Sequence, residues 1–478
     1  MDVLRKSYQQ LDENEREKKT SDRIILGRQI LISSSVWSSF FMFGLCMGTP
    51  TIYISQTRQE ANSTEVLSNE MTSWISSAYN YSAIPNLFIV AILSRYIGRK
   101  KTFLFACLTS AVGFITLYLS TSVIQVIIGE IIQGTLIACD GMICVMVLTE
   151  YTSPRYRGFF LTFKSATFGW GMLVANTMGT FLHWKSITVL GLTCASYAFL
   201  TCLFWPESPY WLASKEKYDE CTKSHRWLKG NQEESINELN SLLKTHKEYS
   251  LIKQEKSQNR TKKTLTALFS KTFYKPFGCT MLMLFLYYFS GKMACNVYAL
   301  QLIKGVTKSD STAYTGMLVI DAVTVFSMYF TSIVVRFYKR KMLFITTSLI
   351  GIMFLLSMSL YLYLCHLDLF EINNFIFLGL LTLYMVVISS GPITISPSII
   401  AELCPLKYRG LFMLLMELVD NIIMGTVVKI LPFLLSAIGA HGTFFFYGGS
   451  SLFLTLLIFY FIPETKDKTI IEIDALMS

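Results

Sequence analysis

The chain has 478 residues, of which 52% are hydrophobic and only 15% are charged, and its formal net charge is +10. Soluble proteins carry about 25% charged residues, so this composition excludes an ordinary soluble enzyme or binding protein. The positive charge alone would suit a nucleic-acid partner, but it is confined to short segments between apolar stretches, as in a membrane protein.

Twelve apolar stretches are long enough to cross a bilayer, which takes about 20 helical residues. Backbone groups in lipid must be satisfied within the segment, so each stretch is predicted to be a helix. Six lie in the first half of the chain, near residues 29–54, 71–94, 102–120, 123–149, 158–180 and 186–205. Six lie in the second half, near residues 276–303, 313–335, 342–363, 371–399, 410–436 and 442–462.

Charged segments divide the chain further. We expect a tail at 1–28, a six-helix half at 29–205, a loop at 206–275, a six-helix half at 276–462 and a tail at 463–478. The loop is the only long connection between spans. Its leucines recur at helical spacing, which favours short amphipathic helices beneath the membrane. We expect both tails to be solvated.

The charged segments repeat at about half the chain length. Glu150 and Arg157 are followed 252 residues later by Glu402 and Arg409. Two further motifs recur at offsets of 241 and 257 residues, pairing Arg99 with Arg340 and Glu207 with Glu464. Internal repeats of apolar helices are typical of transporters that rock one half against the other. The sequence therefore predicts an all-α membrane protein with twelve transmembrane helices in two pseudo-symmetric six-helix halves.

Basic residues fix the expected orientation. Short loops on one side carry Arg95, Arg99, Lys100, Lys101, Arg155, Arg157, Arg336, Lys339, Arg340, Lys341, Lys407 and Arg409. Short loops on the other side carry Arg58, Lys185, Lys304 and Lys308. The first side is cytoplasmic by the positive-inside rule, and so are both termini and the 206–275 loop. Asn62, in the sequence Asn-Ser-Thr, then lies in an extracellular loop and is a candidate glycosylation site.

Several of these motifs, in this order, resemble those of sugar porters of the major facilitator superfamily, most closely insect facilitators of trehalose or hexoses. The resemblance runs from about residue 25 to residue 472. It rests on Pro206-Glu207-Ser208-Pro209-Tyr210-Trp211, Trp227-Leu228-Lys229-Gly230, Glu402-Leu403-Cys404-Pro405 before Arg409-Gly410, and Pro463-Glu464-Thr465-Lys466. It implies a plasma-membrane carrier working by alternating access. Residues 40–54 lack the acid of proton-coupled members, which implies facilitated diffusion.

The resemblance also implies a cytoplasmic gate, in which acidic and basic residues at helix ends pair across the two halves. Its candidates are Arg99, Glu150, Arg157, Glu207, Arg340, Glu402, Arg409 and Glu464. The alternative is that these charges only anchor the topology. Departures from the family pattern at Arg95, Glu130, Tyr210 and Arg336 indicate a rewired network.

The sugar-binding positions of the family are largely replaced. A glutamine position in the fifth helix is Ser165, two glutamine positions in the seventh are Tyr287 and Tyr288, and an asparagine position there is Met293. The candidate solute-binding residues are Ser165, Tyr287, Tyr288, Asn296, Thr324, Asp420 and Asn421. The tyrosines would stack on a sugar ring or an aromatic glycoside, or else simply pack between helices.

Charged residues deep in apolar helices are costly and are commonly functional. We predict one ion pair in each half, Asp140 with Lys164 and Lys292 with Asp321, with either a structural or a transport role. Glu417 and Asp420, three residues apart on one helix face, form a candidate protonatable or cation-attracting site.

These features favour a carrier for a sugar or a related polyhydroxylated solute. A carrier for a glycosylated or aromatic metabolite or a cation, with or without proton coupling, stays open, and so does a membrane sensor that transports nothing. No spacing of nucleophile, base and orienting residue indicates an enzyme, and we expect no cofactor, no metal site and no nucleic-acid partner. We expect a monomer in the lipid bilayer.

Overall fold

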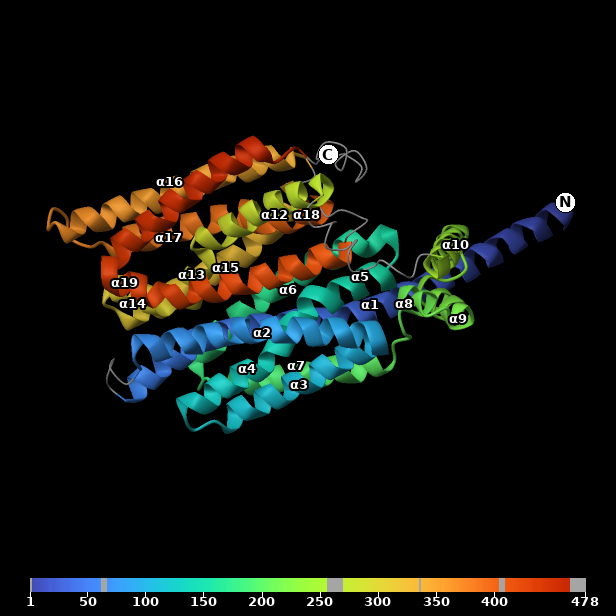
Figure 1. The fold of residues 1–478 in the computed structure, drawn as a ribbon, viewed down its shortest axis with the longest axis horizontal. Helices are drawn as coiled ribbons and strands as arrows, with labels where there is room; N and C mark the ends of the chain where they lie inside the picture. The colour runs from blue at the N-terminus through green and yellow to red at the C-terminus, as the bar shows by residue number, and fades with distance from the viewer. Residues whose placement is uncertain (1, 62–66, 256–269, 335–336, 404–408, 465–478) are drawn as a thin grey trace.

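The computed structural model describes residues 2–61, 67–255, 270–334, 337–403 and 409–464, which contain helices and no strands. Figure 1 shows long rods in a bundle with three short helices at one end. The first half contains α1 (Asp2–Glu60), α2 (Asn69–Ile97), α3 (Arg99–Leu119), α4 (Val123–Cys139), η1 (Asp140–Cys144), α5 (Val145–Tyr151), α6 (Pro154–Phe181) and α7 (Lys185–Leu203). The connection contains α8 (Pro209–Ser214), α9 (Tyr218–Lys229) and α10 (Glu233–Glu255). The second half contains α12 (Lys271–Phe289), α13 (Lys292–Val297), α14 (Ala299–Thr307), α15 (Asp310–Val334), α16 (Arg340–His366), α17 (Asn374–Ile388), η2 (Ser389–Ile393), α18 (Thr394–Leu403) and α19 (Arg409–Phe461).

The all-helical membrane architecture predicted from the sequence is confirmed. By length and composition, eight helical stretches of the described chain can cross a membrane. One of them, α19, turns back at Gly439, whose φ of 66° lies in the left-handed region, so this stretch supplies two rods (Figure 1). With α2, α6 and the run from α12 to α14, the described residues form twelve rods.

Two rods contain a π-helical turn at corresponding places. One, η1, lies between α4 and α5, and the other, η2, lies between α17 and α18. They begin 249 residues apart, close to the 252 that separate Glu150 from Glu402. Single π turns are rare and often mark functional sites. The structural repeat therefore includes this irregularity, and η1 begins at Asp140.

The connection between the halves is attached to the first half. Gln29 of α1 donates from Nε2 to Ser153 Oγ at 2.8 Å and to the Leu228 carbonyl at 2.9 Å. Arg28 donates to the Trp227 carbonyl at 3.0 Å, and its guanidinium lies 4.6 Å from the centre of the Trp227 ring. Helix α9 is thereby held against α1, at the end of the molecule where α1 begins (Figure 1).

A buried polar cluster holds the three short helices together. Lys229 Nζ lies 2.7 Å from Glu238 Oε1, and the Tyr210 hydroxyl donates to the same oxygen at 3.1 Å. His225 is almost fully buried beside them, with Nε2 3.9 Å from Glu238 Oε2. Burial lowers the pKa of His225 to about 4, and the positive charge of Lys229 acts in the same direction.

Candidate functional site

The two halves meet along three sets of helices. Helix α1 packs on α13 and α14, α2 packs on α19, and α6 packs on α15. Toward the end opposite the short helices, Thr51 Oγ1 donates to the Val297 carbonyl, and the Ser55 and Tyr314 hydroxyls lie 3.4 Å apart. The Tyr298 hydroxyl donates to a carbonyl of α2 at 3.4 Å. Direct hydrogen bonds therefore join the halves at this end, which we call the outer end.

A cation also lies between the halves near the outer end. Lys429 of α19 places Nζ 3.3 Å from the centre of the Trp74 ring on α2, and 5.9 Å from that of Tyr81. The Tyr81 hydroxyl is 3.1 Å from the hydroxyl of Thr426, one turn away on α19. A cation over an aromatic face contributes about 0.5–2 kcal/mol, so these contacts stabilise the closed outer end.

At the opposite end, which we call the inner end, the repeated charges cap helices. Glu207 Oε1 accepts from the backbone nitrogens of Arg99 at 2.8 Å and Lys100 at 3.2 Å, the first residues of α3. In the second half, Glu464 accepts from the backbone nitrogens of Arg340 and Lys341, both at 3.2 Å, at the start of α16. A carboxylate at a helix N-terminus satisfies free N–H groups and complements the helix dipole.

The other gate candidates of the first half are brought together within that half. Arg99 and Glu150 form an ion pair at 3.3 Å, and the Ser208 hydroxyl donates to the second oxygen of Glu150. Arg157 is half-buried at the start of α6. The side chains of Glu402 and Arg409 lie outside the described part of the structure, as does the whole of Asn62.

The charges predicted to pair within the first half lie near each other without a direct contact. Asp140 is almost fully buried on η1, and its Oδ1 accepts from Ser39 at 2.5 Å and from the Cys144 thiol at 3.2 Å. Lys164 Nζ lies 4.2 Å from the centre of the Phe40 ring. Among the described side chains, Asp140 and Lys164 do not form an ion pair within 4 Å. Their charges are nevertheless close enough to interact.

In the second half, Asp321 bonds across the contact between the two halves, which we call the seam. Its Oδ2 accepts from Asn176 Nδ2 of α6 at 2.5 Å, and its charge interacts at longer range with Lys292. Lys292 begins α13 directly after Gly291, whose φ of 81° breaks the rod between α12 and α13. Sequence reasoning missed Asn176, although an amide inside an apolar stretch was a signal that could have found it.

Two tyrosines and two acids from α12 and α19 gather at the seam. The Tyr288 hydroxyl donates to Asp420 Oδ1 at 2.8 Å, and the rings of Tyr287 and Tyr288 meet edge to face with centres 4.9 Å apart. Glu417 reaches the first half, because a Cβ on Gly141 of η1 would overlap its carboxylate. The glycine in the π turn thus leaves room for the Glu417 carboxylate.

The remaining solute candidates differ in position. Asn421 donates to the Glu417 carbonyl at 2.8 Å and has a buried Oδ1 without a partner among the described residues. Asn296 is buried and lies 3.9 Å from Met172 Sδ of the first half. Thr324 is buried with its hydroxyl unpartnered in the described structure, whereas Ser165 is exposed.

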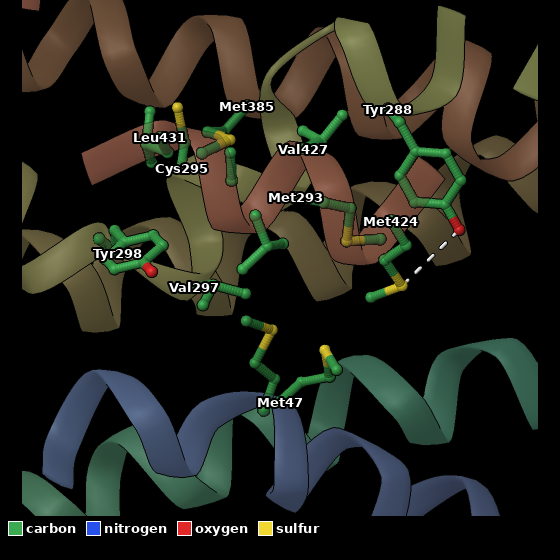
Figure 2. Close-up of a cluster of buried hydrophobic side chains, with 14 of the residues drawn as sticks. Met47, Tyr288, Met293, Cys295, Val297, Tyr298, Met385, Met424, Val427 and Leu431 are labelled. Carbon is green, nitrogen blue, oxygen red and sulfur yellow. Dashed lines mark hydrogen bonds between the residues drawn. The ribbon is translucent and has the colours of Figure 1, made fainter. Parts of the chain in front are cut away.

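Methionines surround this polar group, and sequence reasoning did not select them. Figure 2 shows Met47 of α1 facing Met293 and Val297 of α13, with Met424 and Tyr288 beside them. The Tyr288 hydroxyl lies 3.7 Å from Met424 Sδ. Methionine fills irregular apolar spaces and contacts aromatic faces well. The seam therefore combines soft apolar walls with tyrosines, carboxyl groups and amides.

Two repeated helical halves with polar groups on the seam between them define the class of this protein, a membrane carrier. The chain belongs to the sugar (and other) transporter family, whose family model matches residues 31–477. Carriers, not enzymes, make up the relatives found.

Among curated proteins, the facilitated trehalose transporter Tret1 of Apis mellifera ligustica is 26% identical over 93% of this chain and 87% of its own. The facilitated trehalose transporter Tret1 of Bombyx mori is 24% identical over 96% of this chain and 88% of its own. A solved structure of the proton:xylose symporter XylE bound to 6-bromo-6-deoxy-D-glucose matches with a TM-score of 0.76 at 16% identity, covering 95% of this chain and 99% of that one. An inward-open structure of XylE from E. coli matches with a TM-score of 0.73 at 15% identity, covering 95% and 99%. The predicted major facilitator fold is confirmed.

Proposed function

We propose that this protein moves a sugar or a related polyhydroxylated solute across the plasma membrane by facilitated diffusion. The observation that carries the proposal is the group of polar side chains on the seam, from Asn176 and Asp321 to Tyr288 and Asp420, within a chain of the sugar transporter family. The trehalose specificity named for the insect relatives supports a sugar-like solute. Hydroxyl groups leaving water need such partners, because each unpaired one costs about 1–3 kcal/mol.

Alternating access follows from the contacts between the halves. The outer end is held closed by Thr51, Tyr298 and Lys429, each reaching the other half. The described contacts of Glu150 and Glu207 at the inner end stay within the first half. In the opposite state, these charges would exchange partners with basic residues of the second half and close the inner end, while the outer contacts separate.

We also propose that the inner end faces the cytoplasm and that the protein works as a monomer. The twelve basic residues of the inner loops support this orientation. Asn62 would then carry a glycan. Treatment with an N-glycosidase should increase the electrophoretic mobility of protein from insect cells, and the Asn62→Gln variant should already show that mobility. Asn259 begins a second Asn-X-Thr sequence, in the connection between the halves. Glycosylation of Asn259 in place of Asn62 would reverse the orientation.

Purified full-length protein in liposomes tests the function. We expect saturable uptake of at least one of labelled trehalose, glucose or another hexose, reaching but not exceeding the outside concentration. Protein-free liposomes of the same lipid composition are the control. Uptake equal to that of the protein-free liposomes for every sugar would contradict the proposal. Accumulation driven by a proton gradient would replace facilitated diffusion with coupled transport.

A further inference from the structure

One part of the seam holds more carboxyl groups than ammonium groups. Asp140 of η1, Lys164 of α6, and Glu417 of α19 interact electrostatically with one another, and Glu417 also interacts with Asp420. This part of the seam therefore holds three carboxyl groups and one ammonium group. Charges inside a membrane protein are normally paired. None of these carboxyl groups belongs to an ion pair within 4 Å among the described side chains.

Two buried hydrogen-bond acceptors in this group also lack a donor among the described residues. Asp140 is 1% exposed, and its Oδ2 has no hydrogen-bond partner in the described structure. Asn421, next to Asp420, is equally buried with its Oδ1 unpartnered. A buried acceptor without a donor costs about 1–3 kcal/mol, so the arrangement lacks donors as well as positive charge. Both shortages would be met by a group that is a cation and a hydrogen-bond donor.

The side chains around the acids favour an organic cation. Tyr287, Glu417 and Asp420 are half-buried, so this part of the seam is reached by solvent. Tyrosine faces attract cations. The neighbouring methionines Met293 and Met424 suit the apolar carbon atoms next to a charged nitrogen (Figure 2). No three His, Cys, Asp or Glu side chains of the described residues gather as they would around a metal ion.

We propose that the transported solute carries a protonated amine, which Asp420 and Glu417 receive between the tyrosine and methionine side chains. The inference rests on the proposed carrier function and specifies its substrate class as a cationic sugar or another hydroxylated amine. The Tyr288 hydroxyl, bound to Asp420 at 2.8 Å, orients that carboxylate. The bound amine then supplies a second positive charge to this group of three carboxyl groups.

A matched set of probes tests this. Full-length protein in liposomes is given labelled D-glucosamine, which is mainly protonated at pH 7, its neutral N-acetyl derivative, D-glucose, and tetraethylammonium, a cation without hydroxyls. Thermal unfolding of the detergent-purified protein with each probe gives a second readout, because a ligand of the folded state raises the melting temperature. We expect glucosamine to be taken up about tenfold faster than the N-acetyl derivative, and to stabilise the protein where that derivative does not.

Two variants distinguish the effect of the Asp420 charge on solute preference from an effect on folding. Asp420→Asn should abolish the preference for glucosamine, and Asp420→Glu should retain most of it. Both should unfold near the wild-type temperature without ligand, and if Asp420→Asn does not fold, Glu417→Gln takes its place. An unchanged preference in the asparagine variant would overturn the inference.

The remaining outcomes distinguish the inference from the proposed function. Equal transport of the neutral sugars and glucosamine would overturn the cationic solute and leave the sugar carrier standing. Transport and stabilisation by tetraethylammonium alone would support a cation site and overturn the polyhydroxylated solute. No transport and no stabilisation by any probe would overturn both.

Discussion

At the scale of single residues, the most informative contacts are those of Glu207 and Glu464. Both carboxylates bind the first backbone nitrogens of a long helix, and they do so at equivalent places in the two halves. The repeated Pro-Glu motif therefore has a structural role that does not depend on any gate. Glu150, which binds Arg99 and Ser208, is the better candidate for a residue that changes partners.

Replacing Glu207 by alanine should lower stability. The change leaves the N–H groups of Arg99 and Lys100 without their acceptor, at a cost of about 1 kcal/mol. The melting temperature of the detergent-purified protein should fall by about 1 °C. Glu220→Ala is the control, because Glu220 forms only an exposed ion pair with Lys217 and should change little. Equal melting temperatures for the two variants would argue against the capping role.

His225 makes the short helices sensitive to acid. Its pKa in the folded protein is about 4, below its usual 6.5, so the unfolded segment binds the proton more readily. The stability that this histidine contributes is complete above pH 6.5 and is lost as the pH falls toward 4. Hydrogen exchange in α9 should therefore accelerate over this range.

A His225→Gln variant should show a weaker acceleration, since glutamine does not titrate. The acceleration that remains in this variant would come from protonation of Glu238. Lys229 and Tyr210 hold the pKa of this carboxyl below its usual range against the opposing effect of burial, so acid weakens the same cluster. Identical pH profiles for the variant and the wild type would exclude His225 as the sensor.

At the scale of helices, apolar length and charge spacing predicted the rods well but not their interruptions. Every predicted span overlaps a helical rod of the described chain. The π turns η1 and η2 and the break at Gly291 were not anticipated, because hydrophobic length does not report a change of hydrogen-bond register. One partner across the seam was not anticipated for a related reason. Asp321 bonds to Asn176 across the seam, and a pairing between distant helices depends on how the halves dock.

The pair of α2 and α19 holds the outer end closed through one cation. Lys429→Met keeps the length of the side chain but removes its attraction to the Trp74 ring, worth about 0.5–2 kcal/mol. Spin labels at the outer ends of these helices should then report a larger population with long separations. Lys429→Arg is the matched control and should preserve the short distance. Unchanged distances in the methionine variant would show that other contacts suffice.

At the scale of the whole molecule, the two halves have different kinds of contact at the two ends. Hydrogen bonds and a cation–aromatic contact join them at the outer end, and charged side chains of the first half bind within that half at the inner end. The sequence identified the family, the repeat and the charged ends, because these are local motifs. The solute site was harder to predict, since Met47, Asn176 and Gly141 meet their partners only when the halves are assembled.

The proposed exchange of partners makes Glu150→Gln a test of alternating access. Without its charge, the closed inner end should lose up to about 1 kcal/mol, and the population open at the inner end should rise up to about fivefold. Cysteines introduced at the inner ends of α5 and α18 should react faster with a water-soluble thiol reagent. If Glu150 only anchors the topology, the reaction rate will not change while the glycosylation pattern does.

The π turns also have a consequence for rotational phase. Each residue advances an α-helix by about 100°, and a π turn accommodates one residue more than an α turn. Everything beyond η1 is therefore rotated relative to an uninterrupted rod, and with this offset Glu150 faces Arg99 while Asp140 binds Ser39 of α1. Deleting a single residue from η1 would turn Glu150 away from Arg99 without altering any residue near the inner end. The turn η2 applies the same offset in the second half, to the residues of α18 that follow it.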